Sequence, residues 1–156
     1  CGSLAICIKK ELGKRARVAA VEIDTAAIEV AKENITYHGV EIEIYESDLF
    51  RSLPEDIQPD IVFGDPPWGD ETTLYDDDRS WNHYSAMPPI SVSPLGGKTK
   101  IHEQILREIQ QRNWHCSVAL NAGTLPEEHI HRLGQIIPNY KIRNPREGLS
   151  ILHCNY

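Results

Sequence analysis

Apolar residues recur every three or four positions in four stretches of the chain, a spacing that predicts amphipathic helices. In residues 3–12 the apolar positions share one side, Ser3 is the expected N-cap, and Gly13 ends the pattern. The other helices are predicted over residues 25–38, 98–112 and 126–137. In the helix over residues 98–112, the predicted buried face consists of Ile101, Ile105, Leu106 and Ile109.

Short apolar or alternating runs between these helices predict strands. Residues 17–23 and 60–63 are apolar and β-branched, as in buried parallel strands, whereas residues 40–45 alternate strictly and fit a strand nearer the sheet edge. Further strands are predicted over residues 115–120, 140–143 and 149–154, the last two joined by the turn signals of "NPREG". This alternation predicts an α/β fold with a mostly parallel sheet and an antiparallel C-terminal hairpin at its edge.

We expect residues 1–156 to form a single domain. Residues 69–97 lack a clean periodicity and are too long for an ordinary connection, so they are interpreted as a substrate-side loop or lid, with disorder as the alternative. The chain begins at Cys-Gly-Ser without a methionine or a signal segment. We therefore expect the first strand of the fold to be missing and an upstream segment to precede the chain.

The composition of the chain limits the classes of partner that we expect. The formal net charge of −7 disfavours a phosphate backbone unless a local basic patch offsets it. No apolar run approaches the ~20 residues of a membrane span, so no membrane partner is expected. Cys1, Cys7, Cys116 and Cys154 lack C-x-x-C spacing, which predicts reduced thiols in a cytoplasmic protein and no metal site.

Ligands of open α/β sheets bind beyond the carboxyl ends of the strands, and several polar features of this chain fall there. Gly2 precedes a helix whose N-terminus a ligand can approach. Glu22 follows twenty residues later, the spacing at which an acid accepts hydrogen bonds from ribose hydroxyls. The structural alternatives are a helix-cap glycine and a solvated acid. Asp24 competes with Glu22, or caps the following helix.

Two more features follow the next strands. Asp48 can accept from the exocyclic amine of a purine, or cap a turn. The tetrapeptide Asp65-Pro66-Pro67-Trp68 follows a buried apolar run. Because its prolines fix φ and lack donors, it offers a rigid array of acceptors suited to a planar NH2 nitrogen.

The succession of "CGSLAI", "AVEID", "ESDLF" and "DIVFGDPPW" resembles the class I S-adenosylmethionine-dependent methyltransferases that methylate amino groups. The segment "SPLGGKTKIHEQILREI" is similar to the release-factor glutamine N5-methyltransferases. The resemblance covers nearly the whole chain and implies a Rossmann-like sheet, S-adenosylmethionine as cofactor, and N-methylation. It implies that Gly2 faces the methionine part, Glu22 the ribose, and Asp48 the adenine with Leu49 beside it, and that Ile23 also belongs to the cofactor site.

The same resemblance makes Asp65, Pro66, Pro67 and Trp68 the catalytic group, with Asp65 also bordering the cofactor. The chain differs from the motifs of this family in two respects that affect the assignment. The leading glycines of the first motif are absent, and the glutamine enzymes have Asn-Pro-Pro-Tyr where this chain has Asp-Pro-Pro-Trp. An Asp at this position is more often the pattern of enzymes that act on nucleic-acid bases.

Three functions remain open: a protein glutamine methyltransferase, a nucleic-acid amino methyltransferase acting on adenine N6 or guanine N2, and an inactive cofactor-binding module. Residues 70–84 carry five acids against one arginine, which favours a protein substrate, such as a release factor or another glutamine-containing loop. Nucleic acid would require a basic surface from an upstream domain or a partner subunit. The protein glutamine enzyme is therefore the leading hypothesis.

Overall fold

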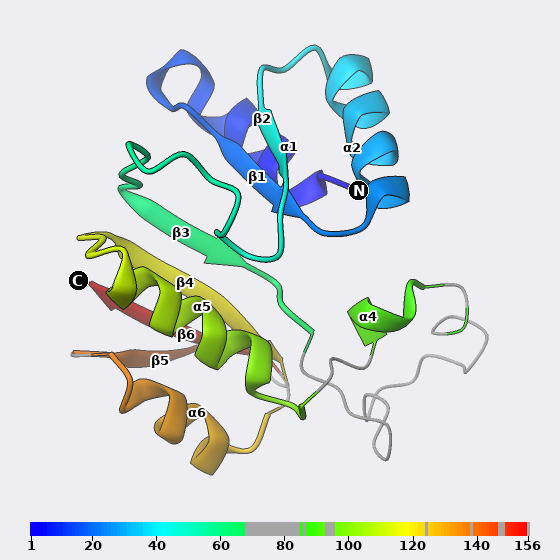
Figure 1. Cartoon of the computed structure of the whole chain (residues 1–156). Helices are drawn as coiled ribbons and strands as arrows, with labels where there is room; N and C mark the ends of the chain where they lie inside the picture. Colours follow the sequence, from blue (N-terminus) through cyan, green and yellow to red (C-terminus); the bar gives the residue numbers. More distant parts are fainter. Residues whose placement is uncertain are drawn as a thin grey trace. The chain divides into compact units, whose positions relative to one another are not determined.

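The computed structural model describes residues 1–67, 85, 87–92, 96–123, 125–137, 139–146 and 149–155. The chain divides into two compact units, Cys1–Ile57 and Gln58–Tyr156, each with its own sheet (Figure 1). The first unit contains α1 (Ser3–Leu12), the 3-10 turn η1 (Gly13–Arg15), β1 (Ala19–Glu22), α2 (Thr25–His38) and β2 (Glu43–Glu46). The second contains β3 (Ile61–Gly64), α4 (Pro89–Val92), α5 (Lys100–Gln111), β4 (Ser117–Gly123), α6 (Glu127–Gly134), β5 (Lys141–Arg146) and β6 (Leu149–Asn155).

The two helices of the first unit have the predicted bounds because local signals set both of their ends. Asp24 caps α2 by accepting a hydrogen bond from Ala27 N at 2.8 Å, and the left-handed Gly39 ends the helix. Gly13 ends α1 as predicted. The predicted N-cap of α1 was wrong: Gly2 is the cap, with φ 73°, and Ser3 is the first helical residue.

In the first unit, β1 and β2 pair in parallel, from Ala19 opposite Glu43 to Glu22 opposite Glu46. α2 connects the two strands and contacts both, as in a βαβ crossover. The buried apolar side chains of this unit come from both helices and from the segments that flank the strands: Ala5, Ile6, Val18, Ile28, Ala31, Phe50 and Leu53.

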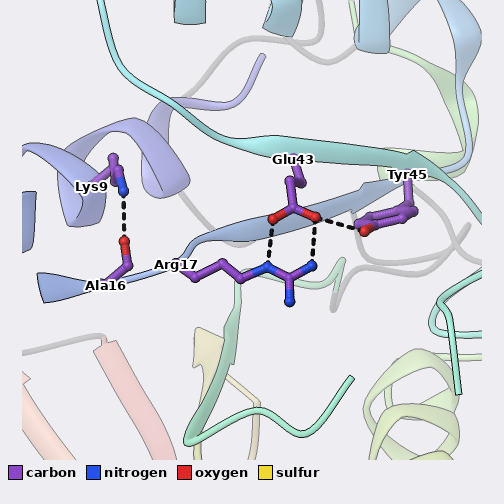
Figure 2. Close-up of polar contacts among 5 residues, drawn as sticks. All are labelled: Lys9, Ala16, Arg17, Glu43 and Tyr45. Carbon is purple, nitrogen blue, oxygen red and sulfur yellow. Dashed lines mark hydrogen bonds and ion pairs between the residues drawn. The ribbon is translucent and has the colours of Figure 1, made fainter. Parts of the chain in front are cut away.

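A polar cluster stabilises the amino end of this strand pair (Figure 2). The Arg17 guanidinium donates to both carboxylate oxygens of Glu43, at 2.5 and 2.8 Å, and the Tyr45 hydroxyl donates to the same carboxylate at 2.8 Å. These bonds, from Arg17 first and then from Tyr45, lower the pKa of Glu43 to about 2. Lys9 Nζ donates to Ala16 O at 2.6 Å and ties α1 to the segment that leads into β1. Because the cluster lies at the end of β1 and β2 opposite to Glu22 and is exposed, we interpret it as structural.

The second unit contains a mixed sheet of four strands in the order β3, β4, β6, β5. β3 and β4 are parallel, whereas β6 pairs antiparallel with both β4 and β5. The α/β class is thus confirmed. The expected single, mostly parallel sheet is not confirmed, because the described strands form two sheets and half of their pairings are antiparallel.

The predicted buried face of α5 needs one correction. His102, rather than Ile101, lies on it together with Ile105, Leu106 and Ile109, and its side chain is fully buried. These four residues occupy positions i, i+3, i+4 and i+7 and so share one face of the helix. Helical spacing therefore puts His102 on the buried face, although the apolar character of Ile101 favoured the neighbouring position.

The predicted loop over residues 69–97 lies mostly outside the described residues; the part that is described includes α4. No described helix has the length and apolar character needed to cross a membrane. All four cysteines are free. Burial raises the pKa of the Cys116 thiol, and it raises the pKa of the Cys154 thiol to about 11. Both thiols are therefore protonated at neutral pH.

Candidate functional site

The Glu22 carboxylate lies at the carboxyl end of β1 and is held by its own backbone. Its Oε1 accepts from Ile23 N at 2.8 Å and from Asp24 N at 3.1 Å. Its second oxygen, Oε2, has no hydrogen-bond partner in the part of the chain that the structure describes. One oxygen therefore fixes the side chain, and the other can accept from a ligand. Asp24 is engaged as the α2 cap, so the structure gives it the alternative role that the sequence allowed.

Asp48 lies just beyond the end of β2, at the same edge of the strand pair as Glu22. Ser47 N donates to Glu22 O at 2.8 Å and joins the two strand ends. The Asp48 carboxylate forms an ion pair with Arg51, three residues on, and both side chains are about half exposed. The next residue, Leu49, has φ 55°, a left-handed backbone that a leucine seldom adopts outside a constrained turn.

Gly2 has a structural reason to be glycine. Its φ of 73° is left-handed, and a Cβ at this position would lie 3.2 Å from Ala31 Cβ in α2. Among the described residues no side chain caps the first turn of α1, so its backbone N–H groups can bind an anion.

In the second unit, Asp65 directly follows β3 and is exposed. Asn121 of β4 donates from Nδ2 to Asp65 Oδ1 at 2.7 Å, a short, charge-assisted hydrogen bond. Asp65 Oδ2 has no partner among the described residues. Pro66 is buried and Pro67 half-buried, whereas Trp68 lies outside the described residues.

Sequence reasoning missed Asn121 and His102. His102 Nε2 lies 2.8 Å from the backbone oxygen of Asn121, and its Nδ1 is buried without a partner in the described part of the chain. Burial lowers the pKa of His102, although the bond to Asn121 and the charge of Asp65 oppose this. Asn121 could have been found by the rule that identified Asp65, namely a polar residue at the carboxyl end of an apolar strand.

The structure thus joins the ends that carry Glu22 and Asp48 in one unit, and brings Asn121 to Asp65 in the other. The ligand roles expected for these residues stay predictions. Among the described residues, no group of three or more His, Cys, Asp or Glu side chains is placed to hold a metal ion.

Comparison with known proteins adds a family context. Residues 1–77 match the family model "Methyltransferase small domain". Over 54 residues the chain is 50% identical to the ribosomal protein L11 methyltransferase of Caldicellulosiruptor bescii and 44% identical to that of Thermosipho africanus. These matches cover about a third of this chain, 35% and 34%, but only 17% and 20% of the two relatives.

Solved methyltransferase structures extend the likeness to almost the whole chain. The structure of a methyltransferase from Pyrococcus furiosus superposes with a TM-score of 0.59 at 15% identity, covering 95% of this chain and 66% of that one. The hMettl16 catalytic domain, in complex with the MAT2A 3'UTR hairpin 6, gives a TM-score of 0.63 at 15% identity, covering 96% and 59%. The chain therefore shares the α/β fold of these methyltransferases. Together with the family match, this supports a class I methyltransferase and leaves the type of acceptor open.

Proposed function

We propose that this chain is the catalytic part of a cytoplasmic S-adenosylmethionine-dependent N-methyltransferase that acts on a planar NH2 nitrogen. The observation that carries the proposal is the Asp65 carboxylate at the end of β3, with Oδ1 held by Asn121 and Oδ2 free within the described residues. Two prolines follow it and contribute carbonyl acceptors without donors.

The described residues of the first unit fit the cofactor in two respects. The uncapped N-terminus of α1, which begins at the left-handed Gly2, suits the carboxylate of the methionine part. The free oxygen of Glu22 suits a ribose diol, because a carboxylate oxygen accepts readily from a hydroxyl. Asp48 and Leu49 would border the adenine, with the Asp48 ion pair to Arg51 as a competitor.

When bound, S-adenosylmethionine supplies an electrophilic methyl group on a sulfonium sulfur. The task of the protein is to present a nitrogen whose lone pair is delocalised. Asp65 Oδ2 and a carbonyl of Pro66 or Pro67 would accept the two N–H bonds, which favours pyramidal nitrogen and stabilises the positive charge that develops on it. Trp68 would stack on the planar group and orient it. The proton leaves afterwards to Asp65 or to water.

A protein glutamine side chain is the proposed acceptor. The net charge of −7 and the acids of residues 70–84 support a protein over a phosphate backbone, and the curated relatives carry the name of a ribosomal protein methyltransferase. A glutamine-containing loop, such as that of a release factor, has the planar amide that the acceptor array suits.

A nucleic-acid amino group is the second candidate. It is supported by the Asp at position 65 and by the similarity to the hMettl16 catalytic domain, whose structure contains an RNA hairpin. An upstream domain or partner subunit would have to supply the basic surface.

Transfer of a labelled methyl group from S-adenosylmethionine to glutamine-containing peptides and to RNA oligonucleotides tests the proposal. Replacing Asp65 with alanine should lower the rate on the order of 10²–10³-fold, because an acceptor for the developing charge is lost. Its proposed hydrogen bonds go to the acceptor nitrogen and it only borders the cofactor, so cofactor affinity should stay nearly unchanged. Asp60→Ala, at the amino end of β3 where Asp60 is also exposed, is the matched control and should keep full activity.

Methylation of peptide alone supports the leading candidate, and methylation of RNA alone supports the second. Cofactor binding without methyl transfer to peptide or RNA would support the third hypothesis, an inactive cofactor-binding module. A rate that survives Asp65→Ala would remove this carboxylate from the reaction.

A further inference from the structure

Asn121 and Asp65 are adjacent because of the strand register. β3 and β4 are parallel, with Phe63 opposite Ala119 and Gly64 opposite Leu120. The next pair along this register is Asp65 and Asn121. The 2.7 Å bond between their side chains is therefore built into the pairing of the two strands.

The backbone of β4 changes its course where Asn121 lies. The register with β6 shifts between Asn121 and Gly123, and Gly123 has a left-handed φ of 52°. Bulges of this kind re-aim a side chain at the end of a strand. Here the bulge lets the N–H of Gly123 donate to Asn121 Oδ1 at 2.9 Å.

The bond from Gly123 decides which end of the Asn121 amide faces Asp65. Because the backbone N–H can only donate, it must meet the amide oxygen, and the NH2 group is left to donate to the Asp65 carboxylate. A rotation of the amide by 180° would break both bonds. The side chain is thus fixed in one orientation.

His102 fixes the backbone of the same residue from α5. Its ring is fully buried, and Nε2 meets the Asn121 carbonyl oxygen at 2.8 Å, so Nε2 carries a hydrogen, and burial, which lowers the pKa of the ring, favours its neutral form. A buried neutral ring that donates to a backbone oxygen holds the strand end without adding a charge beside Asp65.

We infer that Asn121 is a positioning residue for the acceptor carboxylate of the proposed methyl transfer. By occupying Oδ1 of Asp65, it directs Oδ2 toward the N–H of the acceptor nitrogen. His102 and Gly123 hold Asn121 in place for this role. The inference rests on the proposed function for its catalytic consequence, but the Asn121–Asp65 bond can be tested without any substrate.

An exchange of the two side chains tests the pairing. Asn121→Asp alone sets two carboxylates against each other, and kcat should fall by about 10²-fold or more. The double variant Asp65→Asn/Asn121→Asp restores an amide-to-carboxylate bond with donor and acceptor reversed. It should recover at least about 10-fold in kcat over Asn121→Asp, because the partners are again complementary.

Two further variants separate positioning from a general loss of structure. Asn121→Ala should lower kcat by about 10²-fold and leave the cofactor Kd unchanged, because only the orientation of Asp65 is lost. Asn144→Ala, which removes an exposed asparagine of β5 in the same unit, should leave both quantities unchanged. A double variant no more active than Asn121→Asp, or an Asn121→Ala variant with wild-type kcat, would overturn the inference.

A substrate-free measurement keeps the inference separate from the proposed function. In the intact chain, the side-chain NH2 of Asn121 should give two widely separated proton resonances with slow solvent exchange. Asp65→Ala should shift the resonance of the bonded proton toward that of a solvated amide, which narrows the separation, and speed the exchange. Unchanged resonances would refute the positioning role even if methyl transfer occurs. Changed resonances in a chain that transfers no methyl group would refute the proposed function while leaving the bond established.

Discussion

Two replacements of Glu22 distinguish the roles of its two carboxylate oxygens. Oε1 accepts from Ile23 N and Asp24 N, so it stabilises the turn after β1, whereas Oε2, which has no partner among the described residues, is the oxygen proposed to accept from a ribose hydroxyl. Glu22→Gln keeps a neutral oxygen for the backbone but removes the charge. Hydrogen bonds to charged groups contribute about 1.5–3 kcal/mol, so the loss of such a bond should weaken cofactor binding by roughly 10- to 150-fold.

Glu22→Ala removes both functions. Two backbone N–H groups lose a charged acceptor, whose bonds contribute about 1.5–3 kcal/mol each, and water replaces much of this because the site is partly exposed. The free energy of unfolding should therefore fall by about 1–2 kcal/mol in urea titrations, in addition to the loss of affinity measured by calorimetry.

Glu46 offers the matched control for both variants. It is the register partner of Glu22 at the same strand edge, is exposed, and bonds only Thr25 Oγ1, at 3.2 Å, among the described residues. Glu46→Ala should leave the cofactor Kd within about twofold, a change of less than about 0.5 kcal/mol. An unchanged Kd in Glu22→Ala, or an equal loss in Glu46→Ala, would refute the assignment of Glu22 to the ribose.

Two other predictions concern stability. Gly2→Ala should lower the free energy of unfolding by about 2 kcal/mol, measured in urea, because φ 73° disfavours a side chain and the new Cβ would meet Ala31 Cβ at 3.2 Å; a change below about 0.5 kcal/mol would contradict the strain. Burial lowers the pKa of His102 below its ordinary value of 6.5, so the unfolded chain binds this proton first and stability is lost as the pH falls below about 6.5. His102→Gln keeps a donor for Asn121 but does not titrate. Between pH 6.5 and 5 the free energy of unfolding of the wild type should therefore fall by up to about 1.4 kcal/mol per pH unit more than that of this variant. If the unfolding free energies of the two proteins changed in parallel with pH, the role of burial would be refuted.

Helix bounds in the first unit could be read from the sequence because their causes are local. Asp24 and Gly39 set the ends of α2 within its own segment. Strand bounds were less accurate because they depend on partners far along the chain. β2 begins at Glu43 rather than at residue 40, since its pairing with β1 starts there.

The residues of the candidate site likewise fall into those that the sequence predicted and those that depend on distant strand pairing. Residues at strand ends, such as Glu22 and Asp65, were predicted because the end of an apolar run is visible in the sequence. Asn121 directly follows the strand predicted over residues 115–120, but what singles it out is visible only in the structure, where pairing with β6 carries β4 on to Gly123 through a bulge. Its bond to Asp65 spans 56 residues and depends on the register of two strands. Such a contact has no local signal.

The acids proposed to face ligands differ in how the chain holds them. In Glu22 and Asp65, one oxygen is bound by donors from the backbone or the neighbouring strand, so the direction of the other oxygen is set before a ligand arrives. Ordering such a side chain costs little entropy on binding, which favours affinity and correct geometry. Asp48 is paired instead with the exposed Arg51. An exposed pair contributes about 1 kcal/mol or less, so a ligand amine can displace the arginine, but it must then order the carboxylate itself. We therefore expect the ribose and acceptor contacts to set geometry, and the adenine contact to add affinity with less selectivity.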